Sequence, residues 1–170
     1  MEKFCIWVVS PKNDIRQRAF DDIAVGLKEA FRVLGYETPI VSRREQVLGR
    51  PIILATNLLY RIDTRDIPPE AILYNFEQVS LDSLWMTENY LSLLKRHLVW
   101  DYSKTNILRL RELGVKNVSL CPVGYEPILS TIGNYKETID ILLYGRINPT
   151  PQMIIDTLLN RGYNAKILTN

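Results

Sequence analysis

The sequence predicts an α/β protein with a Rossmann-like, doubly wound and mostly parallel sheet that carries helices on both faces. Two features indicate this class. Short apolar runs rich in β-branched and aromatic residues recur along the chain, as in strands buried on both faces. Three helical segments end in the same way, each with a glycine that leads into the next run, at Gly35, Gly114 and Gly162. Repeated helix, glycine and strand is typical of βαβ crossovers, which produce parallel strands.

Each strand is expected from an apolar run of limited length, bounded by turn-forming or polar residues. The expected strands are Phe4–Val9, Thr38–Val41, Ile52–Ala55, Ile72–Tyr74, Leu98–Trp100, Val118–Cys121, Ile139–Tyr144 and Ala165–Leu168. The clearest helix runs from Arg18 to Leu34, with apolar residues on one face at helical spacing. The other expected helices are two pieces over Leu81–Trp85 and Glu88–Lys95, one capped by Ser103 that ends before Gly114, and one from Pro149 to Gly162.

Composition limits the class of protein before any motif is considered. Of the 170 residues, 46% are apolar and 24% are charged, which is average for a globular protein. The net charge of +2 is too small to indicate a nucleic-acid partner. Cys5 and Cys121 lie in apolar runs, which predicts buried, reduced thiols. With no apolar stretch of membrane-spanning length and no secretory signal, we expect a cytoplasmic protein.

The length suits one domain plus part of a second. We expect a Rossmann-like domain over residues 1–135 and a βαβ extension over 136–170. The segment Thr131–Thr138, which contains Gly133 and Asn134, is the expected linker.

Polar residues follow the predicted strands directly, and the run Ile72–Gln78 (ILYNFEQ) shows this best. The carboxyl ends of parallel strands share one edge of a sheet, which is where open α/β sheets bind ligands. We therefore expect one crevice or its rim to be lined by Ser10, Asn57, Asn75, Glu77, Gln78, Asp101, Tyr102, Gly124, Tyr125 and Gly145. In particular, Asn75, Glu77 and Gln78 are expected to be solvent-accessible in a cleft with Asp101 and Gly124.

Glu77 and Asp101 are the candidate catalytic residues of this edge. A carboxylate here could act as a general base, orient a hydroxyl or accept hydrogen bonds from a sugar. Alternatively, Glu77 pairs with an arginine and Asp101 accepts N–H bonds at the start of the following helix. The one histidine, His97, has no nucleophile motif around it, and no glycine-rich phosphate loop or metal-ligand spacing is present. We expect neither a metal nor a cofactor.

Four runs carry a resemblance to a known family. The runs YNFEQ (Tyr74–Gln78), VWDYSKTN (Val99–Asn106), CPVGYEP (Cys121–Pro127) and DILLYGRIN (Asp140–Asn148) together resemble bacterial glycosyltransferases of the two-domain GT-B fold. The resemblance covers most of the chain from about residue 70, and more loosely the segment Ala19–Phe31. In that family the first domain holds the acceptor, the second holds the nucleotide-sugar donor, and the active site is the cleft between them.

The resemblance implies a place for several residues. Glu77 and its neighbours would lie on the acceptor side, Gly124 and Tyr125 near the edge between the domains, and Gly145 with Arg146 at the start of the donor side. The segment from Asp140 onward resembles the opening βαβ unit of the donor domain, and the rest of that domain is missing from the sequence. We therefore expect no glycosyl transfer by this chain alone.

Two hypotheses stay open on these grounds. The chain is the acceptor-side part of a sugar-transferring enzyme that uses a sugar nucleotide and a glycan acceptor, or it is a non-catalytic module that binds a sugar, a nucleotide or a protein. The apolar surface of residues 139–170 is more than one βαβ unit can bury alone, so we expect it to pack elsewhere. It either extends the sheet of the first domain or pairs with the same segment of a second copy, and a homodimer is the favoured arrangement.

Overall fold

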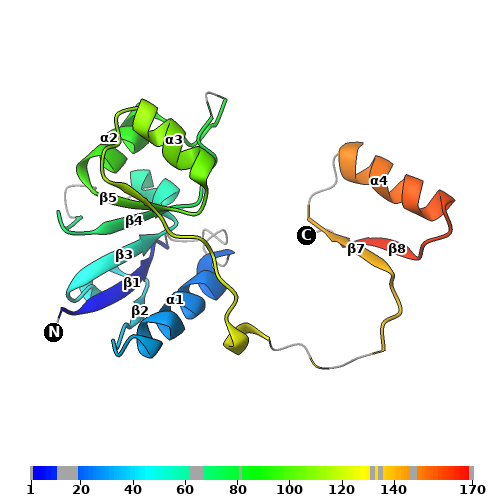
Figure 1. The fold of residues 1–170 in the computed structure, drawn as a ribbon, viewed down its shortest axis with the longest axis horizontal. Helices are drawn as coiled ribbons and strands as arrows, with labels where there is room; N and C mark the ends of the chain where they lie inside the picture. Colours follow the sequence, from blue (N-terminus) through cyan, green and yellow to red (C-terminus); the bar gives the residue numbers. More distant parts are fainter. Residues whose placement is uncertain are drawn as a thin grey trace. The chain divides into compact units, whose positions relative to one another are not determined.

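The computed structural model describes residues 2–10, 19–61, 67–80, 82–130, 133, 136–145 and 149–168 (Figure 1). The chain forms two compact units, 1–130 and 131–170. The division falls at the start of the segment expected to be a linker. Each unit is described by itself.

The first unit is built on a parallel sheet of six strands, as the sequence predicts. The strands are β1 (Phe4–Val8), β2 (Ile40–Val41), β3 (Arg50–Leu54), β4 (Ile72–Asn75), β5 (Leu98–Asp101) and β6 (Val118–Leu120). They lie in the order β2-β1-β3-β4-β5-β6, and every neighbouring pair is parallel. The order of strands reverses between β1 and β3, which defines a doubly wound fold.

Helices cover both faces of this sheet, which confirms the predicted fold class (Figure 1). The helix α1 (Asp21–Val33) packs on one face, and α2 (Glu88–Arg96) and α3 (Lys104–Glu112) pack on the other. Side chains alternate between the two cores along β1, β3, β4 and β5. Ile6, Val8, Leu54 and Tyr74 face α1, while Trp7, Ile53, Leu73 and Val99 face α2 and α3. Burial on both faces explains why β1, β3 and β4 are continuous apolar runs.

Glycines end the helices at the positions that the sequence indicates. Gly35, Gly114 and Gly162 have φ angles of 85°, 90° and 85°, in the left-handed region that favours glycine. After α1, the N–H of Gly35 donates to the carbonyl of Arg32 and the N–H of Tyr36 to that of Phe31, at 3.0 and 2.9 Å. This pattern of two bonds stops the helix and turns the chain into β2.

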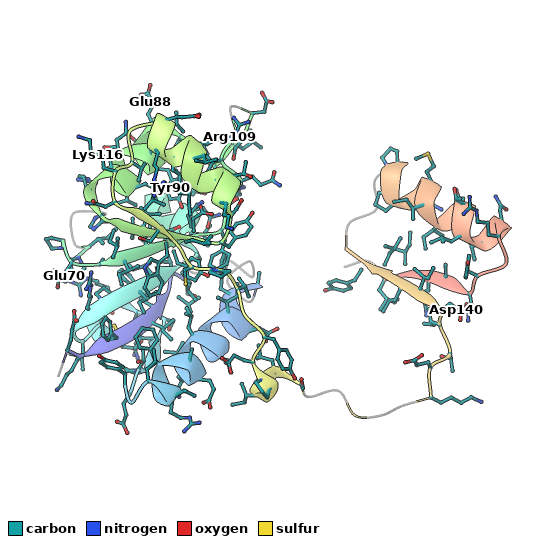
Figure 2. All side chains as sticks on the ribbon, in the orientation of Figure 1. Glu70, Glu88, Tyr90, Arg109, Lys116 and Asp140 are labelled. Atoms are coloured by element: carbon teal, nitrogen blue, oxygen red, sulfur yellow. The ribbon has the colours of Figure 1, made fainter. Side chains whose placement is uncertain are left out.

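The second unit contains β7 (Ile141–Tyr144), α4 (Pro149–Asn160) and β8 (Ala165–Leu168), with β7 and β8 paired in parallel. Asp140 closes the pair at one end, because its Oδ2 accepts the N–H of Asn164 at 2.8 Å (Figure 2). Exposed side chains alternate along both strands. Leu142, Tyr144 and Leu168 are 51%, 71% and 40% exposed.

One of the predicted helices is replaced by turns. Residues 82–85 form turns, where a short helix was predicted from Leu81 to Trp85. The N–H of Ser83 donates to the carbonyl of Ser80 and that of Met86 to the carbonyl of Ser83, both at 3.2 Å, so the chain bends twice. The strand boundaries shift by at most two residues from those expected. No helix of the described residues is both long and apolar enough to cross a membrane.

Candidate functional site

Two open pockets lie beyond the carboxyl ends of β3, β4 and β5, on either side of the turn segment 82–86. The first, which we call the β4–β5 pocket, has a volume of about 620 Å³ and is lined by Phe76, Glu77, Gln78, Ser80, Asp82, Ser83, Leu84, Trp85 and Tyr102. The second, the α2 pocket, measures about 630 Å³ and is lined by Asn57, Tyr60, Leu84, Trp85, Thr87, Asn89, Tyr90, Ser92, Leu93 and Arg96. Leu84 and Trp85 belong to both.

A buried polar network underlies the β4–β5 pocket, and Asn75 is its centre. The Oδ1 atom of Asn75 accepts the N–H of Glu77 and the hydroxyl of Tyr90, at 3.2 and 2.9 Å. Its Nδ2 donates to Asp101 Oδ2 at 2.6 Å and to the carbonyl of Glu77 at 3.0 Å. All four hydrogen bonds that an amide side chain can make are thus used inside the protein. Asn75 is fully buried.

Asp101 is also fully buried, and its carboxylate accepts only from N–H donors. Oδ1 accepts the backbone N–H of Ser103 at 2.8 Å, next to the start of α3. Oδ2 accepts the amide of Asn75 and that of Asn106, the latter at 3.3 Å. Burial raises the pKa of Asp101, and these three donors offset only part of that effect.

Tyr90 and Asn106 connect this network to the helices. Tyr90 lies on the inner side of α2, toward the sheet, whereas Glu88 at the start of the same helix lies at the surface (Figure 2). Burial raises the pKa of Tyr90, so the phenol stays protonated and donates to Asn75. Thr56, after β3, is 2.6 Å from the same phenol oxygen. Asn106 of α3 holds the segment after β4 by donating to the carbonyl of Glu77 and accepting the N–H of Val79.

Aromatic rings form a second layer of the β4–β5 pocket. The rings of Phe76 and Tyr102 are stacked, with centroids 5.9 Å apart and planes 7° apart. Phe76 also contacts Tyr74 and Phe20, with centroids at 4.2 and 5.6 Å. Tyr102 is 37% exposed, so one ring of this supported stack is available to a ligand.

Glu77 is half-buried at the rim of the same pocket, and Gln78 beside it is exposed. The backbone of Glu77 is fixed on both sides, since its N–H bonds to Asn75 and its carbonyl accepts from Asn75 and Asn106. The backbone from which the Glu77 side chain extends is therefore held in place, which a group that orients a ligand hydroxyl requires.

The structure brings together three of the predicted site residues, because Glu77, Gln78 and Tyr102 line one pocket. Asn57, half-buried after β3, lines the α2 pocket instead. The expectation that Asn75 is solvent-accessible is wrong, because its amide is used to hold the segment after β4. The same expectation is wrong for Asp101, whose oxygens are occupied by N–H donors at the start of α3, as in the alternative above.

The remaining predicted residues lie elsewhere. Gly124 and Tyr125 are exposed in the stretch after β6, in neither of the two pockets, and the Tyr125 hydroxyl is 2.8 Å from Ser130 Oγ. Ser10 is half-buried at the end of β1. Gly145 belongs to the second unit, where its φ of 139° and its N–H bond to the carbonyl of Leu168 end β7. Arg146 lies outside the described residues.

Sequence reasoning missed most of the wall of the β4–β5 pocket. The helix predicted over Leu81–Trp85 does not identify Asp82, Ser83 or Trp85 as pocket residues, and no sequence pattern points to Phe76. The turn-forming pair of Asp82 and Ser83 was the available signal, since aspartate and serine favour turns over helix interiors. Among the described residues, no group of three histidine, cysteine, aspartate or glutamate side chains could hold a metal ion.

No family model, curated protein or solved structure matches this chain. A doubly wound α/β fold supports many unrelated activities, so the chemistry must come from the pocket residues themselves. The two pockets offer aromatic rings, hydroxyls, side-chain amides and a small number of charged groups. Such a mixture is suited to a hydroxylated ligand with partly apolar faces.

Proposed function

We propose that the first unit binds a sugar acceptor in the β4–β5 pocket, as the acceptor-side domain of a glycosyltransferase-like protein of the GT-B type. The carrying observation is that two of the runs that resemble this family meet in one pocket. YNFEQ supplies Phe76, Glu77 and Gln78, and VWDYSKTN supplies Tyr102. In the sequence these runs are separated by the α2 segment. The pairing of β4 with β5, the hydrogen bond from Asn75 to Asp101 and the stack of Phe76 with Tyr102 join them.

The side chains of the pocket match the surface of a sugar. A pyranose ring has apolar faces that can stack on an exposed aromatic ring such as that of Tyr102. Its edge carries hydroxyls, which donate to carboxylates and exchange hydrogen bonds with amides. Glu77, Asp82 and Gln78 provide these groups at the rim.

Glu77 is the proposed catalytic residue of this site. A carboxylate that accepts a hydrogen bond from the attacking acceptor hydroxyl can take its proton as the new glycosidic bond forms. At the same time the bond from the donor sugar to the phosphate oxygen breaks, and the nucleotide leaves with that oxygen and its electron pair. Asp101 is not assigned this role, because it is buried below the pocket and bonded to N–H donors. Its proposed part is to position residues 77–79 through Asn75 and Asn106.

The donor in this proposal is a sugar nucleotide, held with the help of the second unit near Gly145 and Arg146. We also propose that the protein acts in the cytoplasm and that two copies pair through the second unit. The support for pairing is the mostly apolar face of β7 and β8, where Leu142, Tyr144 and Leu168 are exposed beside Lys166.

The acceptor proposal is tested by measuring the binding of a panel of mono- and oligosaccharides with isothermal titration calorimetry. Glu77→Gln and Tyr102→Ala are each expected to weaken binding about tenfold or more, since each removes a direct ligand contact. Glu70→Gln is the matched control, because Glu70 is an exposed carboxylate that precedes β4, whereas Glu77 follows it (Figure 2). Equal affinity for the Glu77 and Glu70 variants would contradict the proposal.

Thermal unfolding separates a binding role from a structural one. Glu77→Gln should change the melting temperature very little, because a rim carboxylate contributes little to folding. A large decrease would show that the side chain supports the fold. Acceptor-dependent release of nucleotide from sugar nucleotides distinguishes an enzyme from the alternative, a binding module without turnover.

A further inference from the structure

The β4–β5 pocket and the α2 pocket are neighbours that share a wall. Leu84 and Trp85 line both, and the turn that carries them is fixed by backbone bonds from Ser83 and Met86. Immediately after the turn, Thr87 accepts the N–H of Tyr90 and caps α2. Leu84 is 90% exposed, so the shared wall stands between two open spaces and does not close either of them.

The two pockets differ in charge. The β4–β5 pocket contains the carboxylates of Glu77 and Asp82. The charged side chain among the described residues that line the α2 pocket is Arg96, in the last turn of α2. No carboxylate in the described part of the chain forms an ion pair with Arg96. The other described residues of the α2 pocket are Leu84, Leu93 and side chains with hydroxyl, amide or aromatic groups.

We propose that the α2 pocket is a second subsite for the same acceptor and that it takes an anionic sugar unit. This inference rests on the proposed function of the β4–β5 pocket. The acceptor is then an oligosaccharide that crosses Trp85, with a neutral sugar beside Glu77 and a sugar carrying a carboxylate or phosphate beside Arg96. The acidic residues of the β4–β5 pocket disfavour an anion there. They therefore determine which end of the oligosaccharide lies in which pocket.

Arginine suits this role for a geometric reason. Its planar guanidinium presents paired N–H donors that match the two oxygens of a carboxylate or phosphate. A hydrogen bond to a charged group contributes more than one between neutral groups. Tyr60, 61% exposed, and Trp85 offer aromatic surface for the sugar ring that bears the charge.

The test uses the full-length protein and three tetrasaccharides with the same backbone. One carries a uronate, one carries a phosphate and one is the uncharged methyl ester of the first. Wild type should bind both acidic probes more tightly than the ester, and this preference should weaken with added salt. Arg96→Gln should lower the affinity for the acidic probes about tenfold and leave the ester unchanged. Whether the uronate or the phosphate binds more tightly identifies the anion.

Lys95→Gln is the matched control. It removes the same charge from the same helical turn, but Lys95 lies toward α3, where its side chain approaches Gly114. The control should bind like the wild type. The inference is overturned if Arg96→Gln and Lys95→Gln have equal effects, or if Arg96→Gln weakens all three probes alike.

The same measurements separate this inference from the proposed function. If Glu77→Gln lowers the affinity for the neutral ester while Arg96→Gln changes no affinity, the proposed acceptor site is supported and the second subsite is contradicted. If Arg96→Gln acts as expected and Glu77→Gln changes nothing, the α2 pocket binds an anionic sugar and the proposed acceptor site fails, and with it the inference of a shared acceptor.

Discussion

Asp101 shows how one buried carboxylate can hold a loop without touching a ligand. Each of its oxygens faces N–H donors, from Ser103 on one side and from Asn75 and Asn106 on the other. A group that can only accept hydrogen bonds is required at both positions. This requirement makes the residue sensitive to a change that leaves its shape almost unaltered.

Asp101→Asn should therefore destabilise the protein. The new amide group must face a donor in either orientation, which leaves at least one buried N–H without an acceptor. The expected decrease in the free energy of unfolding is about 1–3 kcal/mol. Urea unfolding at 25 °C measures it.

Asp82→Asn is the control for this prediction, since Asp82 is exposed at the pocket. Its substitution should lower the free energy of unfolding by no more than about 0.5 kcal/mol. An Asp101→Asn variant as stable as the control would show that the three N–H donors do not need a carboxylate.

The sequence correctly places Asp101 at the carboxyl end of a strand. It does not show whether the side chain faces a ligand or bonds inside the protein. Asn75 and Asp101 follow apolar runs, as ligand-binding residues at strand ends do. Their partners Tyr90 and Asn106 come from helices that the local pattern does not connect with them. The residues that reach the pocket are Glu77 and Gln78, which follow Asn75 in the sequence.

At the level of elements, prediction succeeded where a pattern had one physical cause. Strands buried on both faces are apolar along their length, so β1, β3 and β4 could be predicted. A helix that ends in a residue with a left-handed backbone conformation favours glycine there, so the helix end at Gly35 could be predicted as well. Apolar spacing over residues 81–85 had two possible causes. Leu84 and Trp85 line pockets instead of a core, and the chain forms turns there.

Two glycines with similar backbone angles should respond differently to alanine. Gly35 has a φ of 85° and a Cβ there would meet nothing within 4 Å, so Gly35→Ala costs only conformational strain, about 1 kcal/mol. Gly49 has a φ of 74°, and a Cβ would lie 2.3 Å from the carbonyl oxygen of Lys3. That oxygen accepts the N–H of Arg50 at the start of the β1–β3 pairing.

Gly49→Ala must therefore move backbone as well as strain it, and its expected cost is about 2–4 kcal/mol. Chemical denaturation of the two variants in parallel gives the difference directly. Equal decreases in the free energy of unfolding at both positions would mean that the backbone at the start of the β1–β3 pairing can move at little cost.

At the level of the whole molecule, the two units differ in how much apolar surface they bury in a core of their own. Both hydrophobic cores described for the chain consist of residues from the first unit. In the second unit, Ile155 is a buried residue of α4, but Leu142, Tyr144 and Leu168 are exposed on the sheet. A single βαβ unit is marginal unless its open sheet face is covered.

The last prediction follows from that open face. If two copies pair through the second unit, Leu142→Lys should convert the dimer to a monomer. The substitution removes an exposed apolar side chain and places a second positive charge opposite Lys166, its neighbour on β8. Leu108→Lys is the matched control, since Leu108 is 61% exposed on α3 of the first unit. Sedimentation equilibrium over a range of protein concentrations reports the mass of each. A wild-type protein that stays monomeric at the highest concentration would contradict pairing, and the apolar face of β7 and β8 would then have to be covered by some other surface.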